Sequence, residues 1–108
     1  MIGENLQKIT NKYPRILKDL DSDVLVMSEI PEGWIDLVDN LCADLNNLME
    51  EMDPENITNL VVLQVKEKFG SLRFYYHIDT ENNSLYQRLK EAIHKAEVTS
   101  QTVCQFTG

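Results

Sequence analysis

The sequence predicts a small single domain of the α+β class, in which one antiparallel β-hairpin packs against three to four helices. Apolar residues recur at helical spacing from Trp34 to Met52, which indicates a long amphipathic helix. Residues 60–66 and 71–78 instead alternate between apolar and polar side chains, and the short segment between them contains Gly70. The chain has 108 residues, 43% of them hydrophobic, which suffices for one core over residues 1–108.

The first thirty residues predict two short helices and a loop. Leu6 and Ile9 come before Pro14, and a proline is tolerated in the first turn of a helix but not in its interior. Pro14 is therefore expected to open a second short helix. Residues 21–29 contain the apolar run from Val24 to Met27, which could be an edge strand or a packed loop. Periodicity alone does not separate the two, and we interpret the run as a loop.

The later elements follow from turn and cap residues. The long helix should end at Asp53, because Pro54 disfavours helical geometry in the residue before it. A last helix is expected from an N-cap at Ser84 to about Ser100. Residues 102–108 are expected to be extended or loose, and dispensable for folding. The predicted core draws on both long helices and both strands. It contains Trp34, Leu41, Leu45, Leu48, Val61, Leu63, Val65, Phe74 and Leu89.

Charge is strongly segregated along the chain, whose formal net charge is -8. Between Lys18 and Lys66 there are twelve acidic residues and no basic one. A surface of this kind repels nucleic acid and attracts basic grooves. The acidic half is therefore not expected to bind nucleic acid directly.

The predicted long helix carries acidic and amide side chains opposite its apolar stripe. Such a row is either a solvated surface or a docking surface for a groove that normally holds phosphates. The acids do not follow the spacing of a calcium-binding loop. The candidate partner-binding residues of this acidic face are Asp36, Asp39, Asp44, Glu50, Glu51 and Asp53.

The outward face of the hairpin is the second candidate surface. It combines cations with an aromatic ring and an imidazole, a set that can stack on a base, hold a phosphate or bind an acidic peptide. A solvated face or one covered by the last helix is the alternative. Phe69 in the turn either folds back onto the core, which we favour, or anchors a partner. The candidate residues of this face are Gln64, Lys66, Phe69, Arg73, Tyr75 and His77.

The soft metal ligands are too scattered to predict a metal or catalytic centre. Cys42, Cys104, His77 and His94 are the whole set, and none is three or four residues from another. No cofactor, metal site or disulfide is expected, and Cys42 should be a buried, reduced thiol of the helix core. No apolar run resembles a secretory signal or a membrane span, so we expect a cytoplasmic protein.

The segment from Leu63 to Tyr76, LQVKEKFGSLRFYY, resembles the signature of a family of small uncharacterised phage, prophage and bacterial proteins. Tyr13-Pro14, Gly33-Trp34, and Ala96-Glu97 with Ser100 support the resemblance over most of the chain. Members of that family often end in a Cys-x-x-Cys-Gly zinc knuckle. Here Thr107 stands where the second cysteine would be, and one thiolate cannot complete a four-ligand zinc site. The resemblance implies a phage-associated setting and a shared fold, without the zinc site.

These observations favour a binding protein over an enzyme, because no nucleophile and base pair or cofactor loop is visible. We expect an inhibitor that docks directly on a host nucleic-acid-processing defence machine, such as a nuclease or an RNA-guided effector complex, in the host cytosol. An anti-CRISPR protein would have these properties. An immunity protein that neutralises a basic nuclease toxin fits the same electrostatics. A phage assembly or regulatory factor is the third alternative and requires no basic target.

Overall fold

The computed structural model describes residues 1–22 and 25–108, and it confirms the predicted α+β class. In these residues the chain forms α1 (Glu4–Thr10), α2 (Pro14–Leu17), the short 3-10 helix η1 (Glu32–Trp34), α3 (Ile35–Met52), β1 (Asn59–Lys68), β2 (Ser71–Asp79) and α4 (Asn83–Ser100). The two strands pair antiparallel as one hairpin. Residues 23–24, which belong to the predicted 21–29 loop, lie outside the described part.

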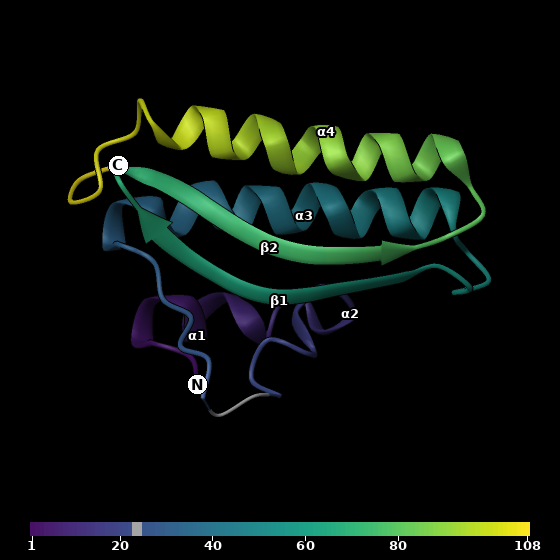
Figure 1. The fold of residues 1–108 in the computed structure, drawn as a ribbon, viewed down its shortest axis with the longest axis horizontal. Coiled ribbons are helices and arrows are strands. Elements are labelled where there is room, and N and C mark those ends of the chain that lie inside the picture. Colours follow the sequence, from purple (N-terminus) through teal and green to yellow (C-terminus); the bar gives the residue numbers. More distant parts are fainter. Residues whose placement is uncertain (23–24) are drawn as a thin grey trace.

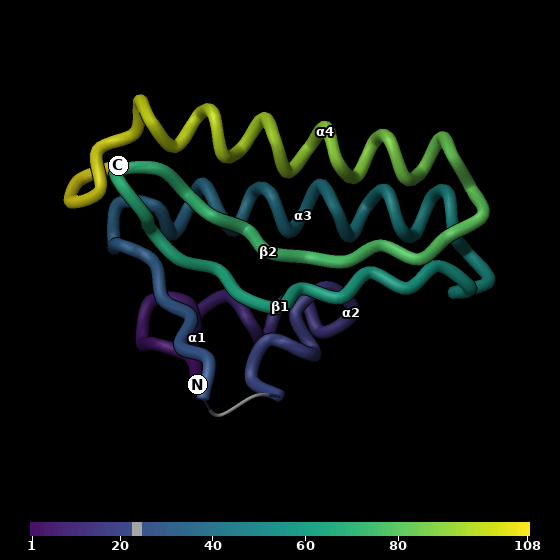
Figure 2. Tube along the Cα trace, in the orientation of Figure 1, coloured from purple at the N-terminus to yellow at the C-terminus, as the bar shows by residue number. Residues whose placement is uncertain are grey.

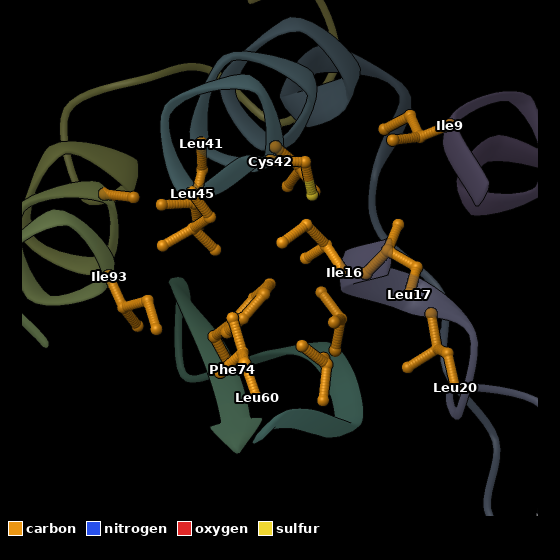
Figure 3. Packing of buried hydrophobic residues seen from close by; sticks show 14 of the residues in the cluster. Ile9, Ile16, Leu17, Leu20, Leu41, Cys42, Leu45, Leu60, Phe74 and Ile93 are labelled. Carbon is orange, nitrogen blue, oxygen red and sulfur yellow. The ribbon is translucent and has the colours of Figure 1, made fainter. Parts of the chain in front are cut away.

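The elements surround one core on four sides. Figure 1 shows α4 running along β2, with α1 and α2 beside β1. The trace in Figure 2 shows that α3 and α4 run in opposite directions along the length of the domain. In Figure 3 the hairpin residues Leu60 and Phe74 lie across the core from Leu41 and Leu45 of α3. The hairpin and α3 therefore occupy opposite sides of the domain.

The N-terminal helices form as predicted. Pro14 is the first residue of α2, and the two helices bury Leu6, Ile9, Ile16 and Leu17. The start of α1 has no side-chain cap of its own. Instead, the Glu29 carboxylate accepts hydrogen bonds from the backbone N–H groups of Asn5 and Leu6, at 3.1 and 2.9 Å. A carboxylate at this end of a helix satisfies free N–H donors and complements the helix dipole.

The loop before α3 closes the outer edge of β1, where the backbone would otherwise be unpaired. Apart from an isolated bridge between Ile2 and Ser28, its described residues form no strand, as predicted. Ser28 Oγ accepts a hydrogen bond from the Val65 N–H at 3.0 Å, and the Glu29 N–H donates to the Val65 carbonyl at 3.0 Å. Ser28 is buried, so these bonds lie away from water.

Helix α4 closes the outer edge of β2 in the same way. Ser100 Oγ accepts from the Leu72 N–H at 2.8 Å, and the Glu97 carboxylate accepts from the Phe74 N–H at 3.0 Å. The helix begins two residues before the predicted position, because the side chain of Asn82, not Ser84, accepts from the Leu85 N–H and forms the N-cap.

The predicted core is partly wrong in β1, because the strand contains a β-bulge. The register slips between Val62 and Gln64, which leaves Leu63 without a cross-strand partner. A bulge interrupts the two-residue alternation, so Leu60, Val62 and Val65 face the core. Val61 is half-buried, and Leu63 points outward with 52% of its surface exposed.

The remaining core predictions agree with the structure. Leu48 is partly buried against the core, and the other predicted residues are buried. They are Trp34, Leu41, Leu45, Val65, Phe74 and Leu89.

The C-terminal segment is neither extended nor loose, contrary to expectation, because it forms turns that pack on the start of α3. The indole Nε1 of buried Trp34 donates to the Val103 carbonyl at 3.1 Å, and the Gly33 N–H donates to the Gln105 carbonyl at 2.7 Å. A Cβ atom at Gly33 would collide with the backbone of Cys104, so only glycine permits this contact. Residues 102–108 therefore cover the start of α3, and their removal would leave the indole N–H without its partner.

The hairpin turn places an aromatic side chain in a strained position. Phe69 and Gly70 connect β1 to β2 and have φ angles of 54° and 81°. Positive φ at both central residues is typical of a type I′ turn, in which Asn-Gly is preferred and a phenylalanine is disfavoured. The Phe69 side chain is 89% exposed, so the prediction that it folds back onto the core is wrong.

We predict that Phe69→Asn stabilises the domain by about 0.5–1 kcal/mol, because asparagine tolerates the left-handed conformation better than phenylalanine. The substitution removes no buried apolar surface that would offset this gain, since the Phe69 ring is exposed. Urea unfolding followed by circular dichroism measures the change. A midpoint equal to or below that of the wild type would show that the turn is not strained in solution.

Candidate docking surfaces

The outer side of α3 carries the acidic candidate surface. Val38, Leu41 and Leu45 fix the inner side of the helix in the core, so its outer side chains have defined positions. Asp36 and Glu50 are exposed on the side away from the core. They lie on a helix of 18 residues, which is about 27 Å long at 1.5 Å per residue. Within the described residues neither carboxylate has an ion-pair partner within 4 Å.

Asp39 belongs to the predicted acidic face but is used inside the chain. Its carboxylate accepts hydrogen bonds from Lys12 Nζ at 2.7 Å and from the Tyr13 hydroxyl at 2.6 Å. The bonds from Lys12 and Tyr13 lower the pKa of Asp39. The hydrogen bond between the Tyr13 hydroxyl and Asp39 also raises the pKa of Tyr13. Asp39 therefore ties the α1–α2 region to α3, and its carboxylate is paired with Lys12.

Asp53 does not share the exposed face either, since only 4% of its surface is accessible. Its carboxylate accepts from Arg15 Nη2 at 2.8 Å and from the N–H groups of Ile57 and Thr58 at 3.1 and 3.0 Å. Asp53 thus joins α2, the end of α3 and the segment that leads into β1. This structural role separates it from the surface predicted from the sequence.

Asp44 and Glu51 turn toward α4 and line an open groove of about 580 Å³. The opposite rim carries Arg88 and Lys95, together with Glu91. No ion pair within 4 Å joins the two rims in the described structure. The floor of the groove is apolar and is formed by Leu37, Leu41, Leu48, Ala92 and Ala96. Sequence reasoning missed the groove because the pairing of α3 with α4 has no local signal.

The structure brings five of the six predicted hairpin residues onto one face of the sheet. Gln64 pairs with Tyr75, and Lys66 pairs with Arg73, so each pair shares a face. His77 pairs with Val61 on the same side, because it lies two residues from Tyr75 along the strand. Together with Leu63 and with Phe69 at the tip, these residues form what we call the hairpin face. Its members are Val61, Leu63, Gln64, Lys66, Phe69, Arg73, Tyr75 and His77.

The two thiols lie in different environments, one buried and one exposed. Cys42 is buried in the core, and burial raises its pKa to about 12, so it is a neutral thiol at physiological pH. Cys104 is exposed, and a hydrogen bond from Thr107 lowers its pKa. Among the residues that the structure describes, no three His, Cys, Asp or Glu side chains are grouped as metal ligands.

Comparison of the chain with protein-family models, with curated proteins and with solved structures found no match. The resemblance to a phage-protein family therefore stays a prediction. Within residues 1–22 and 25–108, no helix combines the length and apolar character needed to span a bilayer.

We predict that the Asp39 contacts stabilise the fold only while its carboxylate is ionised. Folding lowers the pKa of Asp39 from its ordinary value of 3.8. The contribution of these contacts is therefore present above the pKa of the unfolded chain and is lost as pH falls through the lower pKa of the folded state. Asp39→Asn should cost about 0.5–1 kcal/mol near pH 7, and the cost should shrink toward pH 2.

Thermal melts of the wild type and of Asp39→Asn across this pH range measure the difference. Asp36→Asn is the matched control, since Asp36 lies on the same helix without an ion-pair partner in the described structure. An Asp39→Asn effect that is equal at pH 2 and pH 7 would contradict the ionic role.

Proposed function

We propose that this chain is a binding protein that inhibits a nucleic-acid-processing machine by docking the outer side of α3 on a basic groove of its target. The observation that carries the proposal is the group of exposed carboxylates on one rigid helix. Asp36, Asp44, Glu50 and Glu51 are all exposed and form no ion pair within 4 Å among the described residues.

Rigidity supports an electrostatic inhibitor. Each carboxylate is carried by a helix whose inner side is buried, so few backbone degrees of freedom are lost when a partner binds. A groove that normally holds a phosphate backbone presents a row of lysine and arginine side chains. Carboxylates spread over about 20 Å of helix would meet that row and exclude the nucleic acid.

The predicted acidic surface is smaller in this proposal than the sequence indicated. Asp39 and Asp53 are committed to Lys12, Tyr13 and Arg15, so they hold the scaffold together. The remaining four carboxylates are the docking residues. An RNA-guided effector of a host defence system and a nuclease toxin both offer a basic groove, and both would be recognised by the same surface.

We predict that Asp36→Lys with Glu50→Lys abolishes capture of the target while leaving the fold intact, because both side chains are exposed. The matched control is Asp79→Lys with Glu81→Lys, which changes the net charge equally at exposed positions outside α3. Wild type and control should retain a nuclease or effector complex from a nucleic-acid-free host lysate at about 50 mM salt, and should release it near 1 M, where the screening length falls to about 3 Å.

The retained proteins are identified by mass spectrometry and then assayed for nuclease activity with and without the chain. Inhibition by the wild type and control, but not by the α3 variant, is the expected result. If the α3 variant retains and inhibits the same proteins as the wild type, or if no nucleic-acid-processing protein is retained, the proposal is wrong.

A further inference from the structure

The hairpin face is a partly apolar surface, and the preceding loop contacts it at its edge, where the Gln64 amide donates to the Met27 carbonyl at 2.9 Å. Leu63 and Tyr75 are 52% and 41% exposed on it, and Phe69 projects from its tip. Single exposed apolar residues are common, but two on one face of a two-stranded sheet, with a third in its turn, form a candidate contact surface. Figure 3 shows the hairpin across the core from α3, so its outer face is separate from the acidic surface.

Two departures from regular structure place apolar side chains on this face. The β-bulge between Val62 and Gln64 leaves Leu63 and Gln64 both on the outer side, where alternation counted back from buried Val65 would have placed Leu63 in the core. The left-handed conformation of Phe69 holds an aromatic ring in water at the turn. Strained backbone that serves no packing purpose is characteristic of binding sites.

The polar residues of the face determine the chemistry of the partner. Lys66 and Arg73 pair directly across the strands, and Lys68 lies next to Phe69 in the turn. The Lys66 and Lys68 ammonium groups each lie 5.6 Å from an aromatic centroid, those of Tyr75 and Phe69 respectively. In a chain of net charge -8, this face is a local concentration of positive charge, which complements carboxylates on a partner.

The closed edges determine how a partner can bind. Ser28 and Glu29 engage the outer edge of β1, while Glu97 and Ser100 engage that of β2. A peptide that extends the sheet needs a free edge. Contact at this part of the hairpin must therefore be made by side chains of the outer face.

We propose that the hairpin face docks an acidic protein segment, one that offers an apolar pocket or side chains to Phe69, Leu63 and Tyr75 and carboxylates to Lys66 and Arg73. Protein is favoured over single-stranded nucleic acid because the Lys66 ammonium already lies over the Tyr75 ring, on which a base would stack. The chain then has two docking surfaces of opposite charge on opposite sides of its core. This inference does not depend on the target proposed for α3.

The test is selection of random peptides displayed on phage against the immobilised full chain, with counter-selection against the variant Lys66→Glu with Arg73→Glu. The selected peptides should combine aspartate or glutamate with aliphatic or aromatic residues. A fluorescent synthetic copy of one such peptide, and a labelled thymidine oligonucleotide, are then titrated with wild type and variants while anisotropy is followed.

Phe69→Asn should weaken binding of the selected peptide by about tenfold or more, as expected for an aromatic anchor. Since this substitution is expected to relieve turn strain, the loss would not reflect unfolding. The α3 variant Asp36→Lys with Glu50→Lys should bind the peptide as tightly as the wild type. Peptide binding therefore tests the hairpin face whether or not α3 binds the target proposed above.

Three results would overturn the inference. In the first, no peptide survives counter-selection. In the second, the selected peptides bind Phe69→Asn as tightly as they bind the wild type. In the third, the oligonucleotide binds the wild type, and its binding is weakened by Phe69→Asn but not by the α3 variant. The last result would assign the hairpin face to nucleic acid.

Discussion

The hairpin depends on side chains from outside the sheet that complete its backbone hydrogen bonding. A two-stranded sheet alone is only marginally stable in water, and its outer edges leave N–H and C=O groups unpaired. Here Ser28 accepts from the Val65 N–H on one edge, while Ser100 and Glu97 accept from the Leu72 and Phe74 N–H groups on the other. These bonds fix the strands to the preceding loop and to α4, and they let the sheet's inner face cover α3 across the core.

Because the inner face of the hairpin packs on the core and its edges are engaged at Val65, Leu72 and Phe74, its outer face is left to present side chains to solvent. The same arrangement leaves the outer side of α3 free on the far side of the core. The uneven distribution of charge along the sequence thus becomes a separation in space. Acidic Asp36 and Glu50 lie on one side, and basic Lys66 and Arg73 lie on the other.

Elements with a strong local signal were predictable, and features set by distant contacts were not. The spacing of Trp34 to Met52 fixed α3, and Pro14 correctly separated the first two helices. The bulge that exposes Leu63 has no signature in the alternating residues around it. Asp39 and Asp53 look like their exposed neighbours, since their partners, Lys12 and Arg15, are 27 and 38 residues away. Five of the six hairpin residues were found because alternation along a strand does predict a shared face.

Amide hydrogen exchange tests the closed edges most directly, because it reports on individual N–H groups. We expect slow exchange at Leu72, Phe74 and Val65, although each N–H points away from the partner strand. In Ser100→Ala, the Leu72 amide should exchange about tenfold or more faster, corresponding to a loss of about 1.4 kcal/mol of protection, while Val65 on the opposite edge should change little. Fast exchange at Leu72 and Phe74 in the wild type would contradict the account, because the edge of β2 would then be open to water.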